Sequence, residues 1–520
     1  MPPRPPEPAH HTLNLLGQPR FRNPWPSAAR PPLSEWVFKP WLEWYDADKL
    51  LQTGIEDVRV VKPDWGEREL RRRRRKERER WMPPPVSALQ GGKGAEREKE
   101  YVTGTWLGHA GAYATIPLSP PAFSSSASSS ASSSTSPAAS EADKLHLLFD
   151  PIFSPRAGPT SWLGPKRAKD PPCEVEDLPG VDLVFISHNH YDHLDRETIE
   201  RVLKTWPKAR YFVPLGNKPW FTSLGISSHR VFELDWWDEV DLTHTSGRGI
   251  FDQRATLWTG WLVERLVPLP ADFDPPSSRT KRSHSSDSSA ISSAPSGASS
   301  EPGSPTSYLD WARRPLRRGG EGEDEPLLPT LVAADEGAGP PAPQSSSWRS
   351  GARRWVRKGA VFHAGDTGYR PLASSPAVNP AFAALGAHYG PLDLSFVPIW
   401  RGGTLGFLSG LGLRLCHENL PSATHGSPGD GIDIHLAVRS RNTVAVHFGT
   451  FRGSPLETLE ALAGLDDAKM AAGVGDLRRV GSKSERGREG RGRMGAVDIG
   501  ETVVVQGAFF GSLFTTKNVD

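Results

Sequence analysis

The chain has 520 residues and a net charge of +2, so its overall charge implies no attraction to nucleic acid or to an anionic membrane. It contains 51 Gly and 50 Pro, but also 18 Trp and 20 Phe, too many large aromatics for a wholly disordered protein. Cys173 and Cys416 match no metal or redox spacing, which favours free thiols in a reducing compartment. The composition predicts one large domain interrupted by unfolded insertions.

The N-terminus, MPPRPPEPAHH, lacks the apolar core of a secretory signal, and no run of about 18 apolar residues exists to span a membrane. We therefore expect an intracellular, cytoplasmic protein. Residues 1–100 are expected to form a partly disordered extension, and residues 101–520 the domain. Four segments have compositions with little to bury: 1–35, 119–142, 270–350 and 480–494.

In chain order, residues 66–81 carry five consecutive Arg with Glu at helical spacing, which predicts a solvated helix. Residues 111–118 and 145–150 predict a hairpin that a Ser-rich tract interrupts. The apolar run 181–187 suits a strand buried on both faces, and 196–206 has the period of an amphipathic helix. Together with the remaining apolar runs, these segments indicate an α/β architecture. The further strands are expected over 210–215, 229–234, 255–263, 359–364, 393–399, 443–448 and 501–507.

The strongest chemical signal is the segment SHNHYDHLD, residues 187–195, which follows a predicted buried strand and precedes a predicted helix. It therefore lies at the C-terminal end of a strand, where open α/β sheets place their sites. In extended chain His188 and His190 point the same way and can bind one cation. Asp192 and His193 follow on the turn and can reach a second cation. Imidazole and carboxylate ligands without thiolate favour zinc, with iron or manganese as alternatives.

This His-x-His-x-Asp-His pattern resembles the metallo-β-lactamase superfamily, whose fold is a four-layer αββα sandwich with the metals at one edge. Six motifs narrow the resemblance to the N-acyl-phosphatidylethanolamine-hydrolysing phospholipase D family. They cover about residues 101–465 once the insertions are removed. The motifs are TWLGHA (105–110), DPIFSPRAGPTSWLGPKR (150–167), ISHNHYDHLD (186–195), ELDWW (233–237), AGDTGY (364–369) and HFGTF (447–451).

The resemblance implies two divalent metal ions, with zinc expected, and seven ligands. Asp366 would be shared by both metals, and Asp192 would also relay a proton unless it serves only as a ligand. The first metal would be held by His188, His190 and His244, and the second by Asp192, His193 and His447.

The resemblance also implies roles around the metals. Asp150 would brace the histidine loop without binding metal. His425 would face the substrate phosphate, and Trp162 would line the substrate cleft. His109 and His363 are expected to support the ligands or to pack around the site rather than to bind metal themselves.

The implied reaction is hydrolysis of N-acyl-phosphatidylethanolamine to an N-acylethanolamine and phosphatidic acid. The substrate implies peripheral association with internal membranes, including mitochondria as one alternative. Residues 40–51 and 404–415 are candidate membrane contacts, although core packing or a homodimer would explain them equally well. No nucleic-acid partner is expected.

Two other functions remain open at this point. One is another superfamily hydrolase such as a lactonase, a soluble phosphodiesterase or a nuclease, against which the GPKR and DWW segments argue. The other is a non-catalytic scaffold whose Ser- and Pro-rich insertions bind partners. Filled ligand positions argue against the scaffold.

The connection before His244 is unusually short. Relatives place a loop and a strand between the DWW motif and this histidine, whereas only residues 238–243 intervene here. At about 3.3 Å per residue, residues 240–243 reach roughly 13 Å, which would leave no chain to cross the sheet and return. The sequence therefore predicts a misplaced splice junction, or else a genuine deletion that leaves a gap in the sheet.

Overall fold

The computed structural model describes most of the predicted domain. The described residues are 11–13, 19–21, 25, 42–44, 47–70, 101–118, 144–160, 162–244, 247–253, 260–268, 355–372, 375–401, 413–415, 425–478 and 490–506. The predicted insertions at 119–142 and 270–350 lie outside these residues, as does the predicted helix at 66–81 beyond residue 70.

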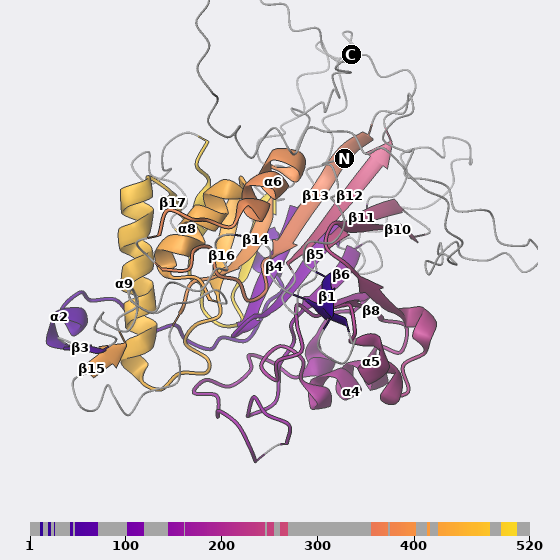
Figure 1. Cartoon of the computed structure of the whole chain (residues 1–520), viewed down its shortest axis with the longest axis horizontal. Helices are drawn as coiled ribbons and strands as arrows, with labels where there is room; N and C mark the ends of the chain where they lie inside the picture. Colours follow the sequence, from indigo (N-terminus) through magenta and orange to yellow (C-terminus); the bar gives the residue numbers. More distant parts are fainter. Residues whose placement is uncertain are drawn as a thin grey trace, which may run out of the picture.

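Two sheets form the centre of the molecule (Figure 1). The first contains, in order, β19 (Thr502–Gln506), β4 (Tyr101–Gly108), β5 (Gly111–Pro117), β6 (Lys144–Phe149), β7 (Leu183–Phe185), β8 (Arg210–Pro214) and β9 (Val231–Leu234). The second contains, in order, β10 (Asp238–His244), β11 (Gly247–Gln253), β12 (Trp261–Pro268), β13 (Trp355–His363), β14 (Leu394–Pro398), β16 (Asn442–Val446), β18 (Arg493–Gly495) and β17 (Gly475–Asp476).

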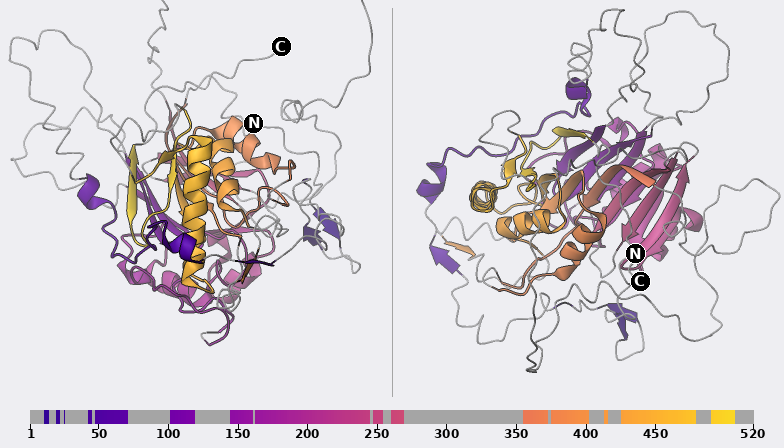
Figure 2. Two further views of the ribbon diagram at one scale, coloured as in Figure 1. Left: turned by 90° about the vertical axis from the view of Figure 1, so that its left-hand side faces the viewer. Right: turned by 90° about the horizontal axis from the view of Figure 1, so that it is seen from above.

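Helices cover the outer faces of both sheets, and this gives four layers. On one side lie α4 (Arg196–Thr205) and α5 (Lys218–Ser223), and on the other α6 (Pro380–Tyr389), α8 (Pro428–Ala437) and α9 (Pro455–Ala472). The two groups of helices are seen on opposite sides of the strands in Figure 1, and Figure 2 shows the same arrangement from two further directions. The predicted αββα sandwich is confirmed.

Successive side chains along the parallel strands point to opposite faces of the sheet, and this alternation places one core on each face. Phe149, Phe185 and Phe212 point into the core between the sheets, where neighbouring rings stack with centroids 4.9 and 5.0 Å apart. Their neighbours Leu148 and Val184 point the other way, into the core beneath α4. Because both faces are buried, these strands read as continuous apolar runs rather than as alternating ones.

Most of the predicted strands are confirmed, with corrections at the edges of the domain. Part of 1–35 is not unpacked, because β1 (His11–Leu13) pairs with β2 (Pro19–Phe21) and Trp25 stacks on Trp236. The segment predicted to be unpacked at 480–494 is too long, because its end forms β18 and Met494 is fully buried there. Residues 52–70 also pack on the domain through Val58, while the boundary at residue 100 stays a prediction.

The gap predicted beside His244 is wrong. β9 ends in the first sheet at Leu234, residues 235–237 connect the sheets, and the short interval is itself strand β10. β10 pairs antiparallel with β11, and His244 lies opposite Gly247. The described strands of the second sheet are therefore paired without interruption from β10 to β17. The splice explanation stays a prediction, but the fold does not require it.

Candidate metal centre

Four parallel strands deliver the site residues at their C-terminal ends. Asp150 follows β6, the histidine loop follows β7, Asp366 follows β13 and His447 follows β16. β6 and β7 belong to the first sheet, whereas β13 and β16 belong to the second. The site therefore lies where the two sheets meet at one end, and both sheets are needed to complete it.

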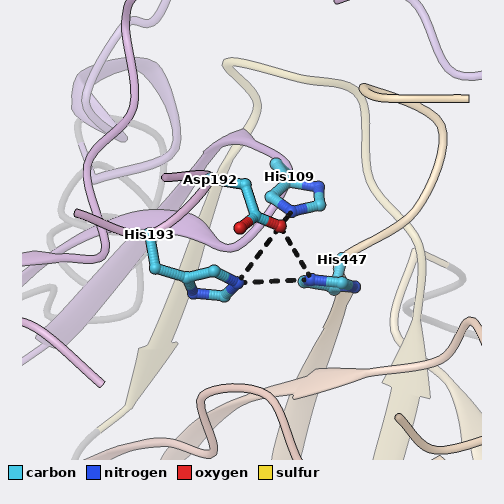
Figure 3. A group of neighbouring side chains, drawn as sticks. All are labelled: His109, Asp192, His193 and His447. Atoms are coloured by element: carbon cyan, nitrogen blue, oxygen red, sulfur yellow. Dashed lines mark hydrogen bonds and ion pairs between the residues drawn. The ribbon is translucent and has the colours of Figure 1, made fainter. Parts of the chain in front are cut away.

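Four donor atoms form a compact cage (Figure 3 shows three of the side chains). His193 Nε2 and His447 Nε2 lie 3.3 Å apart, and they lie 3.7 and 3.9 Å from Asp192 Oδ2. Asp366 Oδ1 lies 3.2 Å from the first nitrogen and 2.8 Å from the second. Ligands held about 2.0–2.1 Å from a tetrahedral zinc lie about 3.3 Å from one another, so the donor set fits a divalent cation.

Asp366 divides its two oxygens between two groups of donors. Oδ1 faces His193 and His447, whereas Oδ2 lies 3.0 Å from His425 Nε2 and 3.8 Å from His188 Nε2. A carboxylate placed in this way can serve two cations at once, as a bridging ligand must. Its burial is nearly complete, with 1% of the side chain exposed. The predicted shared position of Asp366 therefore agrees with its geometry.

Asp150 braces the histidine loop as predicted. Its Oδ1 accepts from the Ser187 backbone N–H, and its Oδ2 accepts from the Ser187 hydroxyl and from His193 Nδ1 at 2.8 Å. A carboxylate bonded to Nδ1 fixes the ring and turns Nε2 toward the metal position. Asp150 and His447 both adopt left-handed backbone, with φ of 39° and 62°. Such conformations are strained for residues other than glycine and cluster at functional sites.

The electrostatics of the site also fit a cation. Burial, reinforced by His193, lowers the pKa of His188 to about 3, so this imidazole keeps the lone pair that a metal ligand needs. Burial opposes protonation of His193, but the carboxylates of Asp366, Asp192 and Asp150 raise its pKa well above the ordinary value. Three carboxylates around one imidazole are an excess of negative charge that a divalent cation would neutralise.

The other predicted residues differ in whether their side chains are buried, exposed or outside the described part of the structure. The His190 side chain is exposed, and its ring lies against that of His188 with centroids 4.5 Å apart. His244 ends β10, but its side chain lies outside what the structure describes. Trp162 is 74% exposed in the loop between β6 and β7. His363 packs as predicted, bonding the Ala110 carbonyl through Nε2.

His109 lies directly beside a predicted ligand, as a residue that supports the ligands would. Its Nε2 lies 2.9 Å from Asp192 Oδ2, and its donor atoms group with those of Asp192, His193 and His447. It stands in the turn between β4 and β5, so the TWLGHA motif carried the available signal: a histidine in a tight turn between two buried strands.

Comparison with known proteins gives the site a family context. A family model described as a beta-lactamase superfamily domain matches residues 146–269. The chain is 38% identical over 143 residues to N-acyl-phosphatidylethanolamine-hydrolyzing phospholipase D 1 of Caenorhabditis elegans, covering 24% of this chain and 40% of that protein. It is 33% identical over 136 residues to the mitochondrial N-acyl-phosphatidylethanolamine-hydrolyzing phospholipase D of Saccharomyces cerevisiae, covering 23% and 28%.

An uncharacterized protein of Mycobacterium tuberculosis is 39% identical over 161 residues, covering 28% of this chain and 43% of that protein. The chain thus matches less than half the length of each of these relatives. The segment that matches the superfamily model includes the histidine loop. Asp366 and His447 lie beyond that segment, and the four-layer fold brings them to the same donor cage. The chain therefore contains a domain of the metallo-β-lactamase superfamily of metal-dependent hydrolases, and part of it is similar to the N-acyl-phosphatidylethanolamine-hydrolyzing phospholipases D of worm and yeast.

Proposed function

We propose that the chain is a zinc-dependent phosphodiesterase of the phospholipase D type, which hydrolyses N-acyl-phosphatidylethanolamine to N-acylethanolamine and phosphatidic acid. The observation that carries the proposal is Asp366, whose two oxygens face two separate groups of imidazoles. The names of the relatives in worm and yeast supply the substrate.

The donor arrangement suits phosphodiester hydrolysis. Two divalent cations, when bound, neutralise the phosphoryl oxygens and the departing alkoxide and make water a nucleophile near neutral pH. His193, His447 and Asp366 are at most 9% exposed at their side chains, so they hold their positions away from solvent. This leaves substrate contact to residues on the open side of the site.

His425 and Asp192 line that open side, with 31% and 28% of their side chains exposed. His425 would donate to a non-bridging phosphate oxygen, and its bond to Asp366 holds the ring in place. Asp192 would serve as the proton relay. Burial opposes its ionisation, but the histidines and the bond from His109 lower its pKa, so the group is a carboxylate rather than a carboxylic acid. These are the proposed catalytic roles of the two residues.

Access to a phospholipid would require peripheral association with a membrane, which we propose as part of the same function. Among the described residues, no helix combines the length and apolar character needed to cross a bilayer. Both segments predicted as membrane contacts meet in one ribbon, where β3 (Leu42–Trp44) pairs with β15 (Leu413–Leu415). Trp44 is 83% exposed there, and Trp side chains favour the membrane interface.

The test is incubation of the metal-loaded chain with N-acyl-phosphatidylethanolamine vesicles, followed by mass spectrometry of the products. Phosphatidic acid and N-acylethanolamine are expected, and vesicles of phosphatidylethanolamine without the N-acyl group serve as the control. A metal-loaded protein that leaves both lipids intact would show that this is a different hydrolase of the superfamily. A Trp44→Ser variant that still sediments fully with vesicles would exclude the ribbon as the membrane contact.

A further inference from the structure

The turn between β4 and β5 brings a histidine into the donor cage from outside the predicted ligand set. Gly108 pairs with Gly111, so His109 and Ala110 form the whole connection. His109 has a left-handed backbone, with φ of 50°, and its side chain is only 6% exposed. Both strands that flank the turn are buried, so the position of this side chain is fixed by the first sheet.

The side chain of His109 holds one cage member directly. Its Nε2 lies 2.9 Å from Asp192 Oδ2, and a carboxylate oxygen only accepts, so the imidazole is the donor. The ring cannot swing away, because it packs against the His447 ring with centroids 4.0 Å apart and against the edge of Phe451 at 5.0 Å. Asp192 stands on a partly exposed loop, so this bond restricts how its carboxylate turns.

The backbone of His109 holds a second cage member. Its carbonyl accepts from the His447 backbone N–H at 2.8 Å, and its own N–H donates to Thr450 Oγ1 at 2.6 Å. Trp106 Nε1 donates to the same carbonyl at 2.8 Å. One residue of the first sheet is therefore bonded to the loop that follows β16 in the second sheet. Asp192 and His447, which come from different sheets, meet at His109.

We propose that His109 is a positioning residue for the metal bound by Asp192, His193 and His447, acting by donating from Nε2 to Asp192. The inference rests on the metal site of the proposed function but not on its lipid substrate. Partners of this kind, which orient a metal ligand without binding metal themselves, change metal affinity by about 10–100-fold when removed.

Two substitutions separate this role from a packing role. In His109→Gln the amide nitrogen reaches as far as Nε2 and can still donate to Asp192. In His109→Asn the shorter amide stops near the position of Nδ1, and Asn tolerates a left-handed backbone, so the variant should fold. The matched control is His435→Gln, which removes a fully buried histidine bonded to Thr443 and to the Arg491 carbonyl, away from the cage.

The full-length chain is loaded with Zn²⁺ or Co²⁺, and metal affinity is measured by chelator competition while the visible Co²⁺ spectrum reports the ligand geometry. His109→Asn should bind one of two metal equivalents about 10–100-fold more weakly, with an altered spectrum. His109→Gln should restore most of the affinity and the spectrum, and His435→Gln should change neither. No lipid enters these measurements, so they stand if the proposed substrate fails.

Three outcomes would overturn the proposal. Wild-type affinity and spectrum in His109→Asn would show that the bond to Asp192 is dispensable. Equal loss in the Asn and Gln variants, with a nitrogen donor missing from the Co²⁺ spectrum, would show that His109 is itself a ligand. Equal loss in His435→Gln would show that any buried histidine has this effect through stability alone.

Discussion

The two ends of the sheet pair are built in opposite ways. At the metal end, β4 and β5 are joined by only His109 and Ala110. The histidines and carboxylates that follow the other strands converge at this end. At the other end β5 and β6 are still paired at Pro117 and Lys144, and β12 and β13 at Pro268 and Trp355. The long Ser- and Pro-rich segments leave from these pairs. Long insertions are thus placed where no ligand has to be held.

The two ends also differ in how their buried charged groups are paired. At the insertion end, Arg357 pairs with Glu264, both about 5% exposed, and also bonds the carbonyls of Tyr389 and Pro391. Arg265 donates to the Pro117 carbonyl, which ties the bases of the two insertions together. At the metal end, by contrast, imidazole nitrogens and carboxylates face one another around a common centre. At the insertion end, the charges of Arg357 and Glu264 neutralise each other within the protein. At the metal end, the carboxylates and imidazoles are arranged to receive an added cation.

The largest expected effect is that of Asp366→Asn at the metal end. A neutral amide does not bridge two cations, so metal content should fall below two equivalents and turnover by about a hundredfold or more. Elemental analysis and a lipid hydrolysis assay measure the two. The control is Asp393→Asn, a buried aspartate at the start of β14 that accepts from the Ala360 N–H, where a loss of about 1–3 kcal/mol of stability with full metal content is expected. Full activity of Asp366→Asn would refute the dinuclear site.

A smaller effect is expected for His425→Ala, on the open side of the same site. Removing the proposed donor to the substrate phosphate should lower turnover about a hundredfold while metal content stays the same. The exposed His229, which bonds only Ser227 among the described residues, supplies the control His229→Ala. Loss of metal together with turnover would reassign His425 as a ligand, as its 3.0 Å distance from Asp366 Oδ2 would allow.

A pH effect is expected at the insertion end. Burial lowers the pKa of His435 from 6.5 to about 4, so the folded state keeps this imidazole neutral while the unfolded chain protonates it below about pH 6.5. The stabilising contribution is present above pH 6.5 and is lost as the pH falls toward 4. The melting temperature of His435→Gln should therefore depend less steeply on pH between 6.5 and 4 than that of the wild type. Parallel melting curves across this range would contradict the assignment.

The smallest effect is expected from deleting residues 276–345. β12 and β13 are paired up to the base of this insertion, and each halving of a flexible loop changes the folding free energy by only about 0.6 kcal/mol. The melting temperature and metal content should stay close to those of the full chain. A large loss of thermal stability would show that this segment packs on the domain.

The sequence predicted best what periodicity and local motifs encode. The runs of β6, β7, β8, β14 and β16 are apolar because both faces are buried, and the histidine motif places its donors by local geometry. Helices α6 and α8 were missed because they are apolar on several sides, with Ala and Gly packed closely, so no amphipathic period marks them. Pro after Asn379 and after Ser427 was the overlooked signal, since both residues cap a helix.

The remaining failures come from contacts that no local pattern contains. The edge strands β10 and β11 read DEVDLTH and GRGIFDQ, too polar to predict a paired hairpin. The supporting role of His109 was predicted without its partners, because Asp192 and His447 stand 83 and 338 positions further along the chain and meet it only after both sheets have packed.

The left-handed backbone at His109, Asp150 and His447 bears on how the protein matures in the cell. Each such conformation costs about 1–3 kcal/mol and persists only because the surrounding sheets impose it. The sheets therefore hold these backbone positions through contacts that do not include the cation, and we expect the fold to form without metal. A newly made chain would then be able to wait in its apo form for metal delivery, which a small zinc-nucleated domain, unfolded without its ion, is unable to do.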